Sequence, residues 1–358
     1  VCVIGAGSDV GRIASLFLKQ SKVIKILAMY DDDPERLVMG VANDLAHIDT
    51  STEVEAYQGR VFLKSALYDS DVVLICGGCY SMPPCCFTQD RDLFFANMQF
   101  VRTITLACAQ FCPQAILAIQ TPPSLKLARV YDARRLLGVN AINAMRANQL
   151  FCSITGSDPR GASVPVICGT GRCTRQFFCI IALGMNPEWN NSEASSLSWF
   201  LKVSSYLAIP MLTLLFQTQA ECLTRLVREA DDIICKVKSN NEQGHLSIGF
   251  STARFVVNLM KEQKDPEKCF GMEICATAVT VGKGGISEYA IPDLSGSEKK
   301  LLEYSKCDLE DMLNLGRCYA LGDEYYLHPC KVCTCCSPPC KVCKPCEVCK
   351  PCNTKKNN

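Results

Sequence analysis

The 358-residue sequence has no excess of charge of either sign, since 37 lysines and arginines stand against 36 aspartates and glutamates. This balance argues against a nucleic-acid-binding protein, which would carry a basic surface for phosphates. Only 20% of the residues are charged and 48% are hydrophobic, so most of the chain can bury an ordinary core and wholesale disorder is excluded. Histidine is scarce, with three residues in the whole chain, so few imidazoles are available for acid–base chemistry.

Cysteine is abundant instead, with 26 residues, nine of them within residues 330–352. Residues 329–358 also carry six lysines and one glutamate, so the end of the chain is basic. The other cysteines are dispersed, and many lie in apolar segments, where cysteine packs as a small hydrophobic side chain. We assign no disulfides to these body cysteines, of which Cys76, Cys108, Cys152, Cys179 and Cys235 are examples. The cysteine count therefore does not indicate a secreted protein.

The first 150 residues alternate between apolar runs and segments with helical spacing. The apolar runs show no polar alternation, which is typical of strands buried on both faces of a parallel sheet; they are residues 1–5, 25–31, 71–78 and 115–121. Helical periodicity occupies residues 10–19, 97–110 and 144–151. Residues 1–150 are therefore predicted to form a doubly wound α/β domain with a parallel sheet.

The remaining chain divides into a second domain and a tail. Residues 151–322 are predicted to form a smaller mixed α/β domain with helices at 221–238, 246–261 and 297–315, and residues 323–358 form the tail. Within the second domain, residues 197–216 are strongly apolar, and residues 203–220 contain no charge. Serines, threonine and Pro210 interrupt this run, which favours a buried or partner-facing helix pair over a membrane span. The membrane span is the alternative.

A glycine-rich turn, Gly5-Ala-Gly-Ser-Asp-Val-Gly11, lies where the first strand meets the first helix. Glycines there permit a tight turn and let backbone N–H groups approach a pyrophosphate at the helix N-terminus. Asp31 ends the second strand, at the distance where a carboxylate accepts both ribose hydroxyls of NAD. Asp9 argues against NAD binding at this turn, because its carboxylate places a negative charge where the pyrophosphate would bind. The alternative is a glycine turn without a ligand.

Several ordered blocks resemble NAD-dependent malate dehydrogenases, particularly the mitochondrial type. They are YD (30–31), GVANDLAHIDT (40–50), TLACAQFCP (105–113), LLGVNAINAMRAN (136–148), SVPVICG (163–169), LSIGFSTARFV (246–256) and GKGGI (282–286). The resemblance extends from residue 1 to about residue 320. It implies a Rossmann-type domain, a mixed α/β catalytic domain of the lactate/malate dehydrogenase fold, and a homodimer with Asp44 and His47 at the contact.

The residues of the family's acid–base pair are absent. In the family a histidine follows the VPVIGG motif, whereas VPVICG is followed here by Thr170. The family's paired aspartate precedes RAN, and this position holds Asn143. A hydroxyl is a poor base at neutral pH, and an uncharged amide cannot stabilise an imidazolium.

Other family positions are partly kept. Arg146 matches the arginine that clamps a substrate carboxylate, and Arg91 is interpreted as a displaced remnant of a loop arginine, with Gln89 as the alternative. Asn97 matches an asparagine that touches the cofactor. In the glycine turn, Gly5 and Gly11 match the pattern, whereas Ser8 replaces the middle glycine and Gly7 is the neighbouring substitute. The resemblance therefore implies weak or lost NAD binding.

The tail repeats Cys-Lys-Pro and Cys-Lys-Val units. Cysteines recur at every third residue, which in a polyproline II segment aligns the sulfurs along one edge; they are Cys340, Cys343, Cys346, Cys349 and Cys352. Three interpretations of the tail remain open, namely covalent or metal-mediated cross-linking, a plain disordered tail, and a discrete zinc module. The composition resembles Cys-Pro-rich sperm-tail structural proteins of insects.

Two functions follow from these patterns. One is a catalytically impaired dehydrogenase fold with a structural or assembly role, which binds protein partners through residues 197–216 and the tail, located in mitochondria or a sperm flagellum. The other is an active or residual NAD-dependent L-malate dehydrogenase of the mitochondrial citric acid cycle.

Overall fold

The computed structural model describes most of the first half of the chain and separate parts of the second. Its described residues are 1–80, 90–122, 131–156, 158–160, 164, 166–167, 180–181, 218–239, 243–262, 268–272, 276–282, 284–290 and a few positions between 294 and 319. Several predicted features lie outside them: Thr170, residues 197–216, and the tail with its repeated cysteines. For Arg91, only the backbone is described.

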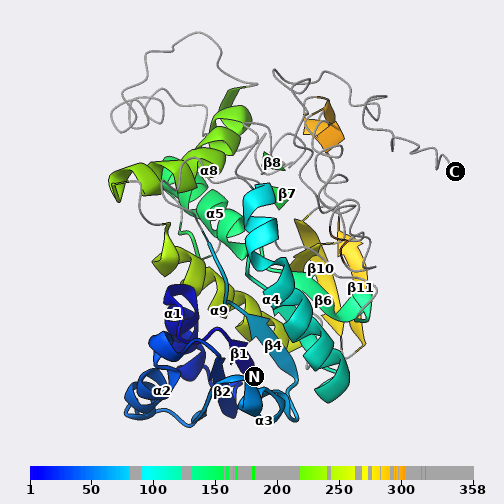
Figure 1. Ribbon diagram of the computed structural model, residues 1–358. Helices are drawn as coiled ribbons and strands as arrows, with labels where there is room; N and C mark the ends of the chain where they lie inside the picture. Colours follow the sequence, from blue (N-terminus) through cyan, green and yellow to red (C-terminus); the bar gives the residue numbers. More distant parts are fainter. Residues whose placement is uncertain are drawn as a thin grey trace, which may run out of the picture.

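A six-stranded parallel sheet organises the N-terminal part (Figure 1). Its strands are β1 (Cys2–Ile4), β2 (Ile26–Asp31), β3 (Glu53–Gln58), β4 (Val72–Ile75), β5 (Ile116–Ile119) and β6 (Leu136–Gly138). The spatial order is β3-β2-β1-β4-β5-β6, and every neighbouring pair is parallel. This order reverses between β1 and β4 and is that of a dinucleotide-binding Rossmann fold. The predicted doubly wound sheet is confirmed.

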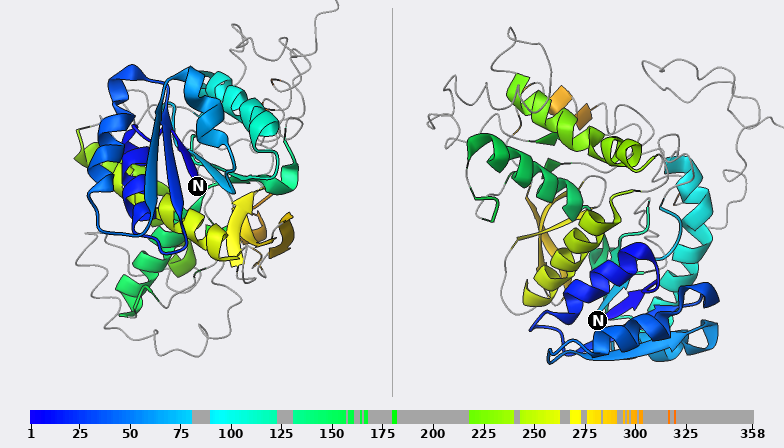
Figure 2. Two further views of the ribbon diagram at one scale, coloured as in Figure 1. Left: turned by 90° about the horizontal axis from the view of Figure 1, so that it is seen from below. Right: turned by 90° about the vertical axis from the view of Figure 1, so that its left-hand side faces the viewer.

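Helices cover both faces of this sheet (Figure 2, left). The α-helices are α1 (Asp9–Lys19), α2 (Val38–Ala46), α3 (Leu63–Leu67), α4 (Asp90–Phe111), α5 (Ala141–Thr155), α8 (Thr218–Val237) and α9 (His245–Glu262). Short 3-10 turns are η1 (Pro34–Arg36), η2 (Arg60–Phe62) and η4 (Ala133–Arg135). Alternate strand residues point to opposite faces, so Val3 packs in the core with α1 and α9, whereas Ile4 packs in the core with α3 and α4.

Two strands of the sheet were not predicted from the sequence. In β3, charged and polar residues recur, and none of its residues is fully buried because the strand lies at the edge of the sheet. The strand β6 is short and ends in Gly138, a residue that weakens a strand pattern. The four predicted apolar runs contain β1, β2, β4 and β5. Almost every residue of these four strands is buried.

The second half places small sheets and two long helices beside the first. The described strands are β7 (Val166–Ile167), β8 (Ile180–Ile181), β9 (Lys268–Met272), β10 (Ala276–Gly282) and β11 (Gly285–Ala290). β7 pairs with β8, and β9, β10 and β11 form an antiparallel sheet. Helix α8 lies beside α5 (Figures 1 and 2) and packs with it around a separate apolar cluster, made by Ala144, Ala147, Val164, Val166, Leu223 and Val227.

The dispersed cysteines pack mostly as the sequence predicts. Cys76, Cys108 and Cys152 are buried free thiols. Cys235 on α8 is also buried, but it is disulfide-bonded, so the prediction that no body cysteine forms a disulfide is wrong. Cys179 lies outside the described residues. Among the described helices, none has the length and apolar character that crossing a membrane requires.

Helix α1 packs closely on α9, and a glycine permits this contact (Figure 1). A Cβ atom at Gly249 would lie 2.6 Å from Ile13 Cγ2 and 2.7 Å from Ile13 Cβ. Ile13 is a branched side chain on the facing helix and has little freedom to move away. By contrast, a Cβ atom at Gly40 in α2 would have no neighbouring atom within 4 Å.

We predict opposite effects for the two alanine substitutions. Gly249→Ala should lower the free energy of unfolding by about 1 to 3 kcal/mol because the added methyl group overpacks the α1–α9 contact. Gly40→Ala should raise the free energy of unfolding of the single chain by roughly 0.5 to 1 kcal/mol, because alanine is the better helix former and no atom of the same chain lies near the added methyl group. Urea unfolding of both variants and the unchanged chain, at one protein concentration, measures these changes in the free energy of unfolding. Stabilisation by Gly249→Ala would contradict the packing argument.

Candidate functional site

The turn after β1 is a close contact between two backbone segments. Gly5 has φ +79°, and its N–H and that of Ala6 both donate to the Tyr30 carbonyl, at 2.8 and 3.0 Å. A Cβ at Gly5 would lie 2.2 Å from Gly77 Cα, and one at Gly11 would lie 2.1 Å from the Gly5 carbonyl oxygen. Both positions therefore require glycine. The turn brings the start of α1 to the carboxyl edge of the sheet, where such folds bind ligands.

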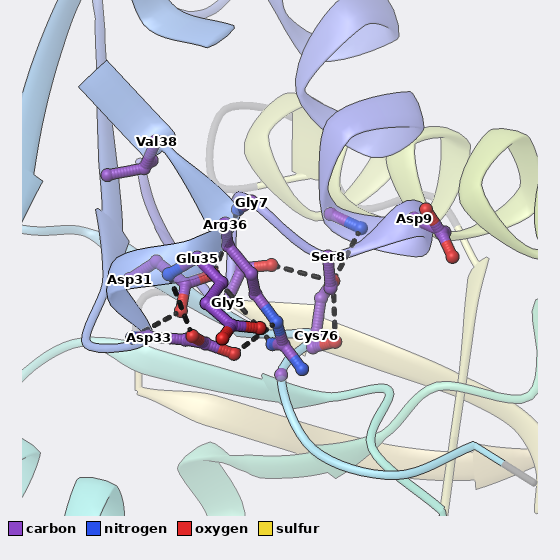
Figure 3. A network of polar contacts seen from close by, with 12 residues as sticks. Gly5, Gly7, Ser8, Asp9, Asp31, Asp33, Glu35, Arg36, Val38 and Cys76 are labelled. Carbon is purple, nitrogen blue, oxygen red and sulfur yellow. Dashed lines mark hydrogen bonds and ion pairs between the residues drawn. The ribbon is translucent and has the colours of Figure 1, made fainter. Parts of the chain in front are cut away.

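Ser8 caps α1 with its side chain (Figure 3). Its Oγ accepts from the Gly11 N–H at 3.1 Å and lies 2.7 Å from the Gly5 carbonyl and 3.1 Å from the Cys76 carbonyl. The serine that replaces the middle glycine is thus a helix cap and is buried in the turn. One N–H group of the first helical turn is consequently satisfied within the chain rather than left for a bound anion.

Asp31 lies at the end of β2, directly beside this turn. Its side chain is 2% exposed; Oδ2 accepts from the Gly7 N–H at 3.0 Å and Oδ1 from the Asp33 N–H at 3.1 Å. Burial raises the pKa of this carboxyl, while the two backbone N–H groups and Arg36 oppose the rise. Gly7 permits the contact, because a Cβ there would meet Arg36 Cβ at 2.6 Å and Asp31 Oδ2 at 3.0 Å. The structure therefore places Asp31 beside the glycine turn, and the binding of NAD by these residues stays a prediction.

Arg36 is a member of this site that the sequence analysis missed (Figure 3). Its guanidinium lies 3.1 Å from Asp33 Oδ2 and 3.8 Å from Asp31 Oδ2, and its side chain is 32% exposed. The signal was present as the i, i+3 spacing of Asp33 and Arg36 around Pro34, where a single turn brings the two charges together. The arginine thus places positive charge 3.8 Å from the buried Asp31 carboxylate.

Asp9 lies in the first turn of α1, where helix α9 also begins. The carboxylate is 56% exposed, and its oxygens lie 2.5 Å from Arg12 Nη2 and 3.5 Å from His245 Nδ1. A carboxylate at a helix N-terminus is favoured by the helix dipole. The Asp9 carboxylate thus already interacts with the positive end of the α1 dipole, which would otherwise attract a pyrophosphate.

Asn97 holds two loops together at the carboxyl edge. Its Oδ1 accepts from the Cys79 N–H at 2.7 Å, and its Nδ2 donates to the carbonyls of Cys79 and Pro122 at 2.7 and 2.6 Å. Its acceptor and both its donors are engaged with backbone, and its side chain is buried. Gly78, with φ +94°, permits this geometry, because a Cβ there would lie 2.5 Å from Asn97 Oδ1. The residue therefore positions the loops after β4 and β5.

Two further predicted residues lie on α5. Asn143 is buried, with 4% of its surface exposed, and its Nδ2 donates to Asn140 Oδ1 at 3.1 Å. Arg146, one turn later, forms two hydrogen bonds with Asp231 of α8, from Nη1 to Oδ2 at 3.0 Å and from Nη2 to Oδ1 at 2.6 Å. Sequence reasoning missed Asp231, because no local pattern links residues 85 positions apart.

The expected dimer-contact residues lie on one exposed side of the molecule. Asp44 and His47 are both exposed, on α2 and at its C-terminal cap. His47 and His245 are the histidines among the described residues. His47 lies at the C-terminal end of α2, and His245 contacts Asp9.

Comparison with known proteins agrees with this geometry. Residues 1–132 match the family model described as the NAD-binding domain of lactate/malate dehydrogenase. The mitochondrial malate dehydrogenase of Sus scrofa is 30% identical over 340 residues, with 88% of this chain and 90% of that protein covered. A malate dehydrogenase of Mannheimia succiniciproducens is 28% identical over 323 residues, with 84% of this chain and 93% of that protein covered.

Two solved structures share the fold. One is a lactate dehydrogenase from Cryptosporidium parvum complexed with lactic acid and nicotinamide adenine dinucleotide, with TM-score 0.66 and 18% identity over 88% of this chain and 96% of that one. The other, from Eimeria maxima with NADH and oxamate, has TM-score 0.68 and 17% identity over 91% and 96% of the two chains. The Rossmann order of the sheet, the glycine turn beside Asp31 and the 30% identity to the Sus scrofa enzyme lead to one conclusion. The chain belongs to the lactate/malate dehydrogenase family.

Proposed function

We propose that this protein is a catalytically impaired member of its family that binds NAD weakly and serves a structural or assembly role. The observation that carries the proposal is the uncharged Asn143 at the position of the family's aspartate, together with Thr170 at the position of its histidine base. Asn143 is buried and donates to Asn140, a neutral contact with no carboxylate to orient a base. Loss of a general base typically lowers a rate by about 10²- to 10⁴-fold.

The residues of the turn fit NAD in part. Gly5 and Gly11 permit the tight turn at the start of α1, and Gly7 permits the close approach of the Asp31 carboxylate. When bound, NAD would supply the hydride acceptor or donor of the family's reaction. Asp9 acts against the pyrophosphate, because it adds a negative charge at the start of α1. The proposal is therefore weak NAD binding rather than its complete loss.

The competing function is an active or residual L-malate dehydrogenase that interconverts malate and oxaloacetate. It is favoured by the preserved glycines, by Arg146 at a substrate position, and by the identity to mitochondrial malate dehydrogenases. In that case Thr170, directly or through a water, would have to replace the histidine base.

Turnover with NADH and oxaloacetate distinguishes the two functions. The purified chain should be at least about a hundredfold slower than the Sus scrofa enzyme assayed beside it, because the base is missing. Any residual rate should be the same in Thr170→Val, which removes the hydroxyl and keeps the shape of the side chain. Turnover within about tenfold of the Sus scrofa enzyme would overturn the proposal, and a rate abolished by Thr170→Val would favour the competing function.

We predict that Asp9→Asn strengthens NADH binding. Removal of the carboxylate should lower the Kd by about three- to tenfold at low salt, because the helix N-terminus, Arg12 and His245 then face the pyrophosphate without a competing negative charge. The gain should shrink at high salt. Asp49→Asn, an exposed acid between α2 and β3, is the matched control and should leave the Kd unchanged. Fluorescence titration with NADH measures both, and equal affinities for both variants would contradict this role of Asp9.

For the location and partners, we propose a homodimer in mitochondria or in a sperm flagellum. Support for the mitochondrion comes from relatives named as mitochondrial malate dehydrogenases. Support for the flagellum comes from the tail, whose cysteine and proline repeats favour cross-linking between chains, with zinc binding as the alternative. Residues 197–216 are proposed as the surface for protein partners.

Gel electrophoresis of native material tests the tail. Without reductant the chain should migrate as covalent oligomers, and with reductant as a monomer. A variant with Cys340, Cys343, Cys346, Cys349 and Cys352 changed to serine should lose most of the oligomers. A monomer under both conditions, with zinc found by elemental analysis, would replace cross-linking by a metal site.

A further inference from the structure

Helices α5 and α8 enclose one ion pair beside their apolar contact. The arginine side chain is 10% exposed and the aspartate side chain 23% exposed, so both charges are largely withdrawn from water. Alanine, leucine and valine side chains of the two helices, with Val164 and Val166, form the apolar cluster, which includes Ala147, the residue after Arg146. A charge in such a place is stable only with a partner of opposite sign.

The geometry of the pair is that of a bound carboxylate. Both terminal nitrogens of Arg146 contact Asp231, one on each carboxylate oxygen, at 2.6 and 3.0 Å. This two-point fork is the arrangement by which a guanidinium holds the carboxylate of a ligand. Asp231 therefore offers Arg146, from within the chain, the same two oxygens that a small carboxylic acid would offer.

A ligand carboxylate must displace Asp231 before it can use Arg146. The competitor is tethered on the adjacent helix, so its effective concentration at the guanidinium is in the millimolar range or above. Displacement would also break the two hydrogen bonds that Asp231 accepts from Arg146 in this partly buried place. Of the described residues near Arg146 on α5, Asn143 is neutral, and Asn148 uses its Oδ1 to accept from the Val164 N–H at 2.7 Å.

We propose that Asp231 is an internal substitute for a ligand carboxylate and that it determines the specificity of this site by excluding small carboxylic acids from Arg146. The proposal rests on the assignment of Arg146 to the substrate position in the proposed function. It adds a second, independent obstacle to catalysis, because a base restored at residue 170 would still face an arginine already engaged. Loss of the base would impair proton transfer, whereas Asp231 would impair only the binding of a ligand carboxylate to Arg146.

Oxalate binding to the full-length chain tests this, measured by calorimetry with and without NADH. Asp231→Asn should bind oxalate at least tenfold more tightly than the unchanged chain. Asp232→Asn is the matched control, with the same change of charge at the next, exposed residue of α8, and it should leave binding unchanged. Adding Arg146→Gln to Asp231→Asn should abolish the gain. Equal oxalate affinity in Asp231→Asn and the unchanged chain, or a gain that survives Arg146→Gln, would overturn the proposal.

Thermal melting provides a second readout when removal of Asp231 destabilises the fold. Oxalate should raise the melting temperature of Asp231→Asn and leave that of the unchanged chain the same, because only the variant has a guanidinium open to the anion. If the variant is recovered unfolded, refolding in oxalate should restore cooperative melting, and failure to do so would count against the proposal. These outcomes are measured by binding and not by turnover, so a failure of the oxalate test would overturn the role of Asp231 and leave the missing base of the proposed function standing.

Discussion

The contact between the turn after β1 and the loop after β4 is the constraint on which the rest of the N-terminal structure depends. Gly5 and Gly77 approach so closely that a single added carbon at Gly5 would lie 2.2 Å from the other backbone. This approach fixes the direction in which α1 leaves the sheet, and it places Ser8 over the Cys76 carbonyl and Gly7 against Asp31. Helix α1 then meets α9 where Gly249 leaves room for Ile13.

A second theme is that polar groups at the ligand-binding edge are satisfied within the chain. Ser8 accepts from the first turn of α1, Asn97 joins two loops, and Asp31 takes two backbone N–H groups. Unsatisfied polar groups are costly when buried, so this pairing stabilises the fold without a ligand. This internal pairing also lowers the binding free energy that a ligand can gain, because the ligand must match or displace each internal partner.

The fold could be predicted largely from the sequence where burial was continuous. The runs that form β1, β2, β4 and β5 are buried on both faces, and continuous apolar sequence has few other structural outcomes. Edge strand β3 escaped prediction, because one of its faces meets solvent and its composition is mixed. For the site, glycines and Asp31 were predictable from their spacing, since a turn is a local structure. Arg36 was predictable in principle for the same reason, and the disulfide of Cys235 was not.

Sequence by itself determined the Rossmann-type architecture and the family, because these follow from local burial patterns and from residue identity at given positions; the replacement of the acid–base pair at Thr170 and Asn143 is a prediction from the sequence. Tertiary structure alone decided which polar groups are already engaged. Arg146 and Asp231 lie 85 positions apart, and Asp9 and His245 are farther apart still. Only the packing of α5 on α8, and of α1 on α9, brings these charges within reach, because helix packing is set by side chains spread over the whole chain.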